Sequence, residues 1–286
     1  AGFADGPGLK VSLFERLAWR APQALITLAA QYRMNGPICA LISELFYDGR
    51  LRPGGAAVAA ARLSTKYDVR STARVDDWRE KVWDDTPIVL LDTSRDQTAR
   101  DTVREWRGDE SRDNPREAAL LAELLVAFFQ RLPRATWADV AADVGVISAY
   151  RKQNNRLRAE IAAREPALAA LPALRIDTVD RFQGGEREVL LVSLVNSNDG
   201  RAIGPLHADP RRLNVALSRA KTKLIIAGDR DTFTGAGRPE EEPAKEVYRR
   251  LFALLDAQAR AGAARIVDSG VCGPPSPPML GGGTLI

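Results

Sequence analysis

The sequence predicts an α/β fold in which a parallel sheet is flanked by helices. Short, continuous apolar runs of strand length recur along the 286 residues, as expected for strands that are buried on both faces. Segments with the apolar spacing of helices lie between these runs. This alternation indicates parallel strands joined by right-handed helical crossovers.

The expected strands are the continuous apolar runs themselves. ALITL at 24–28 is expected to form a short strand near the start of the chain. The further expected strands are PIVLLDT (87–93), VGVIS (144–148), LRID (174–177), REVLLVSLVNS (187–197) and TKLIIAG (222–228).

Two of the expected helices carry clear start signals. In the first, Asn35 can cap the helix, Pro37 suits its first turn and Gly49 suits its end. In the second, NPRE at 114–117 places a capping Asn, a Pro and a capping-box Glu in order. Four other helices are expected at 11–18, from about 150 to 163, at 211–220 and from 245 to about 261.

Composition divides the chain into three parts. Residues 1–24 form a lead-in, 25–262 form the main lobe, and 263–286 form a flexible tail that is rich in Gly and Pro. Within the lobe, 52–113 is expected to be an irregular insertion followed by a charged loop. Residues 92–113 contain 12 charged side chains among 22 residues, which is typical of a solvated segment.

Composition also excludes several kinds of site. The chain is 45% hydrophobic and 27% charged, as in globular proteins. Cys39 and Cys272 form no ligand pattern and His207 is the single histidine, so no metal site is expected. No apolar run approaches ~18 residues and no signal peptide is visible, so we expect a cytoplasmic protein without membrane contact.

The charge balance is compatible with a nucleic-acid partner, though only weakly. The net charge is +4, and 34 of the 41 basic residues are Arg. This bias looks genome-wide, so a local cluster of Arg carries less information than usual. The chain begins with Ala1 rather than Met, and we therefore expect a piece of a longer protein.

Polar residues that follow buried strands are the first candidates for a site, because open α/β sheets bind ligands off the carboxyl ends of their strands. The candidates are Gln31–Tyr32–Arg33, Ser148–Tyr150–Arg151, Thr178 through Glu186, and the helix that leads to Arg219. In that helix, Arg212 and Arg219 share the face opposite the apolar stripe. A guanidinium held there can offer a planar fork of donors to a phosphate.

Three segments resemble motifs IV, V and VI of one helicase family. They are ITLAAQYRMNGPICALISELFYDGRL (26–51), IDTVDRFQGGEREVLLVSLVNSN (176–198) and RRLNVALSRAKTKLIIAGD (211–229). In this order and spacing they resemble the C-terminal RecA-like lobe of superfamily 1B helicases, which move 5′→3′ on single strands. Within the Dna2-like and Upf-like branch, SLFERL (12–17) and VGVISAYRKQ (144–153) favour the Dna2-like helicase–nucleases.

The chain departs from the family pattern at three positions. Asn35 stands where many members have His, Ala149 where Pro is common, and Ser218 where Thr is more frequent. The Asn is frequent among the helicase–nucleases, so it bears on the subfamily. Ser218 keeps the hydroxyl.

The resemblance implies a nucleotide side of the lobe. Arg219 resembles the arginine finger that neutralises charge on the transferred phosphoryl group, and Arg33 resembles a phosphate-pairing residue. Gln31, Tyr32, Gly185 and Glu186 are then nucleotide-binding residues. Tyr32 would stack on the adenine, with a half-buried core position as the alternative.

The resemblance also implies contacts to single-stranded nucleic acid. Thr178 matches the motif V threonine that touches the backbone, and Gln183 would relay between the two ligands. Ser148, Tyr150 and Arg151 resemble the segment that lines the strand channel. Arg151 and Lys152 are equally compatible with an ordinary charged helix surface.

Two motifs with which helicases of this family bind ATP and Mg²⁺ are not found in this sequence. No GxxxxGK[ST] cradle is present, and no Asp-Glu pair ends an apolar strand. ATP and Mg²⁺ are therefore expected to be bound with ligands from an N-terminal RecA-like lobe of the same parent chain, and this chain alone is expected to be inactive. The alternatives are an RNA helicase of the same branch and a stand-alone nucleic-acid-binding or regulatory module.

Overall fold

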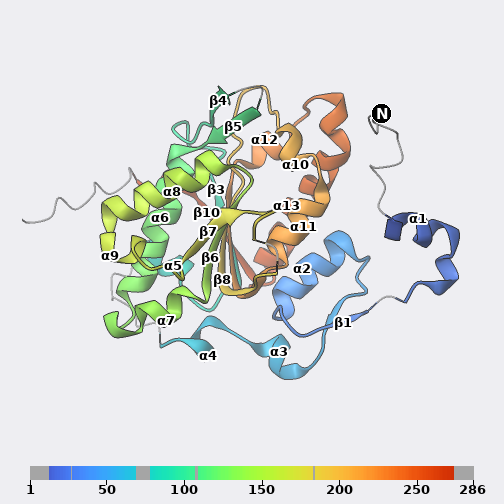
Figure 1. Ribbon diagram of the computed structural model, residues 1–286, viewed down its shortest axis with the longest axis horizontal. Coiled ribbons are helices and arrows are strands. Elements are labelled where there is room, and N and C mark those ends of the chain that lie inside the picture. Colours follow the sequence, from blue (N-terminus) through green and yellow to red (C-terminus); the bar gives the residue numbers. More distant parts are fainter. Residues whose placement is uncertain (1–12, 27, 69–77, 107–108, 183, 274–286) are drawn as a thin grey trace, which may run out of the picture.

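The core of the protein is a six-stranded sheet (Figure 1). The computed structural model describes residues 13–26, 28–68, 78–106, 109–182 and 184–273. All neighbouring strands of this sheet pair in parallel, which confirms the predicted α/β fold. From one side to the other the strands are β10 (Ala264–Asp268), β3 (Ile88–Asp92), β9 (Ala220–Gly228), β8 (Arg187–Ser193), β6 (Val144–Ser148) and β7 (Arg175–Thr178).

The strand register defines two rims of the sheet that matter for function. Ser148 pairs with Thr178 on one side and with Ser193 on the other, so these strands end level with one another. We call this the carboxyl rim. At the opposite ends of the strands, Arg187 pairs with Ala220, and we call this the amino rim. The seven residues of β8 separate the two rims by about 20 Å.

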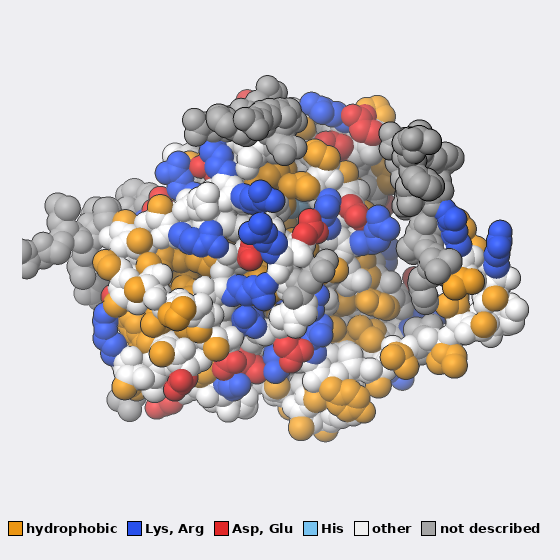
Figure 2. All heavy atoms as spheres, viewed as in Figure 1, with side chains coloured by type: hydrophobic (Ala, Val, Ile, Leu, Met, Phe, Trp, Pro, Cys, Tyr) orange, Lys and Arg blue, Asp and Glu red, His pale blue; other side chains and the backbone are white. Residues whose placement is uncertain are grey.

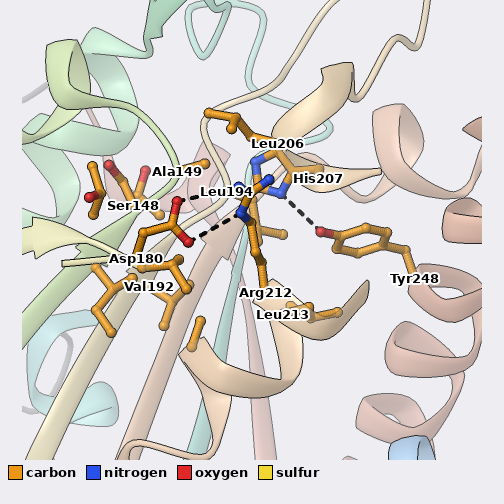
Figure 3. A pocket seen from close by; sticks show the side chains of 15 residues that line it. Ser148, Ala149, Asp180, Val192, Leu194, Leu206, His207, Arg212, Leu213 and Tyr248 are labelled. Carbon is orange, nitrogen blue, oxygen red and sulfur yellow. Dashed lines mark hydrogen bonds and ion pairs between the residues drawn. The ribbon is translucent and has the colours of Figure 1, made fainter. Parts of the chain in front are cut away.

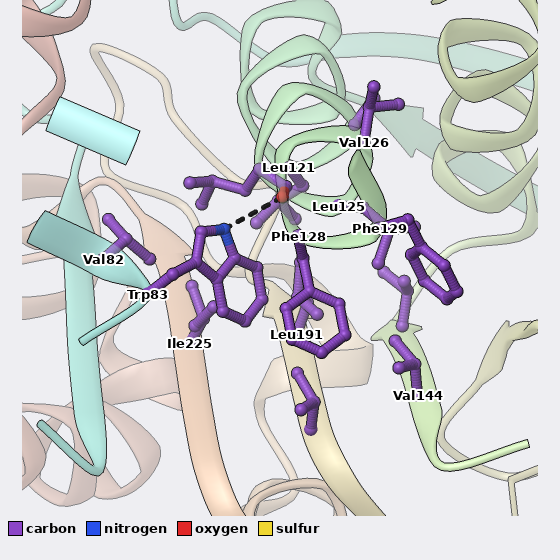
Figure 4. Packing of buried hydrophobic residues seen from close by; sticks show 14 of the residues in the cluster. Val82, Trp83, Leu121, Leu125, Val126, Phe128, Phe129, Val144, Leu191 and Ile225 are labelled. Carbon is purple, nitrogen blue, oxygen red and sulfur yellow. Dashed lines mark hydrogen bonds between the residues drawn. The ribbon is translucent and has the colours of Figure 1, made fainter. Parts of the chain in front are cut away.

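The central strands contribute alternate side chains to two apolar cores. Val89 and Leu91 of β3 lie in one core, whereas Ile88 and Leu90 lie in the other. In the first core, Trp83 stacks on Phe128 with ring centroids 4.6 Å apart and donates a hydrogen bond to a helix carbonyl (Figure 4). The elements of this face are α5 (Trp78–Val82), α6 (Pro115–Gln130), η2 (Arg134–Thr136), α7 (Trp137–Ala141), α8 (Arg151–Arg164) and α9 (Pro166–Ala169).

Helices from both halves of the chain cover the other face. The long helix α13 (Glu242–Arg260) packs against α2 (Gly36–Phe46), as Figure 1 also shows. The other elements on this face of the sheet are α10 (Gly204–His207), α11 (Pro210–Leu217), α12 (Arg230–Thr234) and η3 (Pro239–Glu241). Both faces of the sheet are therefore covered by helices, which explains why the sequences of its strands are continuous apolar runs.

The two helix starts predicted from the sequence are confirmed. The Asn35 side chain accepts a hydrogen bond from the Ile38 amide at 3.2 Å. The Asn114 side chain does the same for Glu117 at 3.1 Å. Each cap satisfies one of the amides that a helix start leaves without a partner.

The start of the chain differs from the prediction. The expected strand at 24–28 is absent from its described residues, where η1 (Pro22–Ala24) ends and the chain continues without pairing. Ile26 and Leu28 are exposed there, and pairing begins only with β1 (Ala30–Gln31) beside β2 (Arg52–Pro53). The other elements of this region are α1 (Leu13–Arg20), α3 (Ala56–Ala60) and α4 (Leu63–Lys66). An apolar run makes a strand only where a neighbouring strand can accept its hydrogen bonds.

The charged segment 92–113 contains a hairpin where a loop was predicted. The strands β4 (Thr102–Trp106) and β5 (Asp109–Asp113) pair in antiparallel register. Asp113 is buried and forms ion pairs with Lys152 at 2.6 Å and Arg156 at 3.1 Å. These contacts with α8 give polar strands a partner that composition alone does not reveal.

The end of the chain also differs from the prediction. Part of the expected tail at 263–286 forms β10, which pairs with β3 over five residues, and then η4 (Ser269–Cys272). Ala264 and Val267 are buried, while Ile266 is partly exposed. Such a short outer strand carries too little apolar pattern to stand out beside Gly and Pro. Among the described residues, no helix is both long and apolar enough to cross a bilayer.

Candidate nucleotide site and nucleic-acid groove

The amino rim brings together side chains from three distant segments. Arg33 donates from Nε to Glu186 Oε2 at 2.7 Å and from Nη1 to the Ser218 carbonyl at 3.0 Å. Lys221 Nζ lies 3.4 Å from the other oxygen of Glu186. The bond from Arg33 is the main reason why the pKa of Glu186 lies below its ordinary value. Glu186 therefore remains a carboxylate held between two cations.

Arg219 lies beside this group without sharing its carboxylate. It follows the Ser218 cap of α11 and directly precedes β9. Burial, and then the neighbouring charge of Arg33, lower its pKa. Its Nε is buried and has no hydrogen-bond partner within the described part of the chain. A guanidinium in this state is available to an anion that reaches the rim.

Gln31 shapes the loop that carries Arg33. Its side-chain oxygen accepts from the amides of Arg33 at 2.8 Å and Met34 at 2.7 Å, and its amide donates to the Met34 carbonyl at 2.8 Å. The Asn35 amide then ties this loop to the Lys221 carbonyl at 2.9 Å. Gln31 is thus a positioning residue whose polar atoms are already engaged.

Tyr32 points its ring out of the fold. The residue is 73% exposed, which excludes the core position considered as an alternative. Its ring lies on Gly54, where an added Cβ would approach the ring Cε1 to 2.3 Å. The exposed ring is therefore free to stack on a flat ligand.

The carboxyl rim carries a groove of about 750 Å³. Thr178, Arg151 and Tyr150 line it, together with residues of the β4–β5 hairpin and of the loop before α10. The remaining basic residues of its lining are Arg112, Arg181 and Arg238. Figure 2 shows Lys and Arg side chains spread across the middle of the face between α8 and α11, with few acidic ones among them. A groove of this charge suits a polyanion.

A buried network holds the wall of this groove. Lys245 donates to the carbonyls of Arg201 at 2.6 Å, Thr232 at 2.8 Å and Gly235 at 2.8 Å. Glu241 accepts from the Gly204 amide at 2.9 Å. Both side chains come from the α13 side, so the loop before α10 is fixed to a long helix.

Comparison with known proteins identifies the family. The family described as "AAA domain" matches residues 9–231 of the chain. The chain belongs to this family.

The relatives narrow the identification to a Dna2-like superfamily 1 helicase lobe. "DNA replication ATP-dependent helicase/nuclease dna2" of Schizosaccharomyces pombe is 31% identical over 234 residues, covering 80% of this chain and 16% of that protein. The mouse "DNA replication ATP-dependent helicase/nuclease DNA2" is 35% identical over 230 residues, covering 77% and 20%. The chicken "Putative helicase MOV-10" is 31% identical over 244 residues, covering 78% and 24%. The chain thus spans a quarter or less of each of these relatives.

The predicted site residues of the helicase lobe lie on both rims of the sheet. From the sequence we expected all of them at the carboxyl ends of strands, where open α/β sheets bind ligands. Glu186 precedes β8 and Arg219 precedes β9, so both lie at the amino rim with Arg33. Thr178 ends β7 at the carboxyl rim. The rule applies to residues that follow a strand, and these two come before one.

Ser148 and Tyr150, which were predicted to contact the nucleic-acid strand, are buried in the helicase lobe. The Ser148 hydroxyl lies 2.9 Å from both the Tyr150 carbonyl and Asn154 Oδ1, and it accepts from the Tyr150 amide at 3.2 Å. Tyr150 is 3% exposed, so its ring cannot stack on a base in this conformation. Arg151 is exposed beside them, whereas Lys152 is engaged by Asp113.

Three predicted residues of motif V follow Phe182, namely Gln183, Gly184 and Gly185. Gln183 lies outside the described residues. Gly184 has a φ of 76°, which favours glycine, while an added Cβ at Gly185 would lie 3.3 Å from Arg175 Nη1. Phe182 anchors the segment, since it packs against Gly145 of β6 and has the Arg175 guanidinium 4.7 Å from its ring.

Sequence reasoning missed Arg112, Arg181, Arg238 and Lys221 in the helicase lobe. Arg181 and Lys221 lie within the quoted motifs and could have been weighed there. Arg112 and Arg238 lie in loops and hairpins with no helical or strand period, and nothing local marks them.

The amino rim fits phosphate better than it fits a metal ion. Among the described residues, no group of three or more His, Cys, Asp or Glu is arranged to hold a metal. Arg33, Lys221 and Arg219 surround Glu186, and such guanidinium and ammonium groups are suited to phosphate oxygens.

Proposed function

We propose that this chain is the C-terminal motor lobe of an ATP-dependent 5′→3′ DNA helicase. The observation that supports this most directly is the meeting of Arg33, Glu186 and Arg219 at the amino rim. They come from three motifs that are far apart in sequence. A shared set of cations at one rim is what catalysis of phosphoryl transfer from a neighbouring lobe requires.

In the proposed nucleotide site, Arg219 acts as the arginine finger. Its guanidinium neutralises charge that develops on the γ-phosphoryl group in the transition state. Arg33 contacts phosphate oxygens while Glu186 keeps its fork oriented, and Tyr32 stacks on the adenine. Mg²⁺ would supply Lewis-acid chemistry, and its ligands are expected from the N-terminal lobe.

In the proposed strand site, the groove at the carboxyl rim holds single-stranded DNA. Thr178 and Arg151 contact the phosphate backbone, and Arg181 and Arg238 add positive charge along the groove. Arg112 also lines the groove, but it is paired with Asp101 at 3.2 Å. Contacts of this kind grip the backbone and read few base edges. Binding should therefore be salt-sensitive and nearly independent of sequence.

The proposed nucleotide site and the nucleic-acid groove lie on rims about 20 Å apart. If ATP turnover is to move the DNA strand, an element of the fold must link the two rims. The helix α11 runs between them, with Arg212 near its start and Arg219 just beyond its end. The segment from Thr178 to Glu186 makes the same crossing and is anchored by Phe182. These two elements are the candidates for coupling.

DNA is favoured over RNA as the substrate because the relatives at 31–35% identity include DNA replication helicase–nucleases. The RNA helicase of the same branch remains the alternative, since such grooves bind either backbone. A stand-alone binding module is disfavoured, because a lobe without a motor partner has no use for the retained Arg33, Glu186 and Arg219.

The test is Arg219→Ala in the two-lobed parent enzyme. We expect kcat for ATP to fall ~10³-fold or more, with KM changed far less, because the finger acts mainly in the transition state. The control is Arg50→Ala, an exposed arginine that pairs with Asp48 at 3.0 Å. An equal loss in both variants would exclude the finger. Competition between single-stranded DNA and RNA then tests the substrate.

A further inference from the structure

An ion pair stands at the boundary between the groove and a small cavity behind it. Arg212 donates from Nε to Asp180 Oδ1 at 3.3 Å and from Nη2 to Oδ2 at 3.4 Å. Figure 3 shows the two side chains facing each other, with the hydrogen-bonded His207 and Tyr248 beyond. Asp180 lines both the groove and the cavity, whereas Arg212 lines the cavity alone.

The cavity is too small to receive a base. Its volume is about 30 Å³, which leaves space for only one or two water molecules. Its walls include apolar side chains such as Val192, Leu206 and Leu213. A polyanionic ligand must therefore approach Arg212 from the groove.

Asp180 is an acidic residue in a groove that is otherwise basic. Among the described residues that line the groove it is the one acid, beside Arg112, Arg151, Arg181 and Arg238. A groove built only for a polyanion would gain from losing this carboxylate. Its bidentate contact with Arg212 supplies a reason for its presence.

The ion pair between Arg211 and Asp209 differs from the one between Arg212 and Asp180 in how firmly its carboxylate is held. Arg211 is bound to Asp209 at 2.9 Å, but Asp209 also caps α11 and cannot leave without cost to the helix. Asp180 lies outside any helix or strand. The side chains of Arg212 and Asp180 are 35% and 59% exposed, and exposed pairs of this kind contribute only about 0–1 kcal/mol.

We infer that Arg212 is a further phosphate contact of the strand groove, and that Asp180 keeps it engaged until a backbone phosphate replaces the carboxylate. The inference rests on the proposed strand groove. A phosphate offers the guanidinium the same bidentate geometry as Asp180 and makes a charge-assisted bond of at least equal strength. The exchange also moves Asp180 away from the incoming strand.

The test is the binding of a fluorescent single-stranded DNA oligonucleotide to the 286-residue chain, measured by anisotropy at two salt concentrations. Arg212→Gln should weaken binding and reduce the salt slope by about one. Asp180→Asn should strengthen binding about three-fold, the size of an exposed ion pair. The decisive variant combines Asp180→Asn with Arg212→Gln, where the gain from Asp180→Asn should disappear. Thermal melts check that each variant folds.

The control for loss of a surface carboxylate is Asp48→Asn, at an exposed pair on another part of the molecule. It should leave affinity unchanged. If Asp180→Asn strengthens binding equally with and without Arg212, the carboxylate is only a general repulsive charge and the inference is wrong. If Asp180→Asn has no effect on a chain that does bind the oligonucleotide, the inference alone fails. If the unaltered chain does not bind at all, the groove assignment fails and this inference falls with it.

Discussion

At the scale of single residues, the exposed ring of Tyr32 depends on the absence of a side chain at Gly54. The ring lies so close that a methyl group at Gly54 would come within 2.3 Å of it. Because Tyr32 is 73% exposed, the ring can swing away without disturbing the core. The two residues thus form a platform whose position can be changed without changing the fold.

We predict that Gly54→Ala raises KM for ATP in the two-lobed enzyme and leaves stability nearly unchanged. A displaced platform should cost about 1 kcal/mol, near the lower end of what stacking on an aromatic ring contributes, or about five-fold in KM. The matched control is Gly55→Ala, where an added Cβ meets nothing within 4 Å. Both changes stiffen the unfolded chain alike, so steady-state kinetics should separate them. Equal KM values would exclude the stacking role.

At the scale of elements, the carboxyl end of β8 is held by a buried carboxyl group. Glu117 of α6 accepts from the Ser193 hydroxyl at 2.6 Å and from the Val195 amide at 3.0 Å. Val195 has a φ of 70°, and the Asn196 amide donates to the Leu194 carbonyl at 2.7 Å. This is a tight turn in a conformation that β-branched residues rarely adopt. Glu117 therefore stabilises a strained turn.

The pKa of Glu117 makes this support sensitive to pH. Burial raises the pKa of Glu117 from 4.5 to about 8. Between these values the folded protein holds a proton that the unfolded chain has released, so stability is lost as pH rises through about 8. His207 acts in the other direction, because burial lowers its pKa from 6.5 to about 4 and stability falls below pH 6.5.

We predict that Glu117→Gln becomes more stable relative to the unaltered protein as pH rises from 7 to 8.5, because the variant lacks the group whose contribution to stability declines in this range. Buried Lys223 also titrates in this window, because burial lowers its pKa from 10.5 to about 7 and its contribution to stability rises with pH. This rise opposes the decline from Glu117, so the variant is compared with the unaltered protein at each pH. The amide oxygen can still accept from Ser193 and Val195. Urea unfolding at both pH values measures the difference, with exposed Glu44→Gln as the control. An equal difference in stability between the variant and the unaltered protein at both pH values would contradict the buried-proton argument.

The elements also show what the sequence can and cannot predict. Strands such as 144–148 and the capped helices at Asn35 and Asn114 were predictable, because burial on both faces and cap chemistry leave local patterns. The β4–β5 hairpin was not, since its partner Lys152 lies far along the chain. The rim that carries Arg219 was missed for a similar reason. Motif resemblance brought Arg33, Glu186 and Arg219 together, but only strand order and register place them at the amino rim.

At the scale of the whole molecule, basic side chains gather at two separate rims, for which we propose different ligands. The amino rim carries Arg33, Lys221 and Arg219 around Glu186, and the carboxyl rim carries the basic groove. No phosphate cradle is present in the sequence, and the described residues contain no cluster of acids suited to a metal ion. Under the proposed function, this chain is expected to supply charge stabilisation, and the N-terminal lobe is expected to hold Mg²⁺ and position the attacking water.

We predict that the purified 286-residue chain hydrolyses ATP no faster than buffer, with or without single-stranded DNA, although it binds the strand. Arginine groups stabilise a transition state only when another site has aligned the phosphates and the attacking water. A phosphate-release assay measures this, and Arg219→Ala in the isolated chain is the control for contaminants. Any background activity that survives this change comes from another protein. Hydrolysis that is stimulated by DNA and lost in Arg219→Ala would show a complete active site within this chain, and the two-lobed mechanism would have to be abandoned.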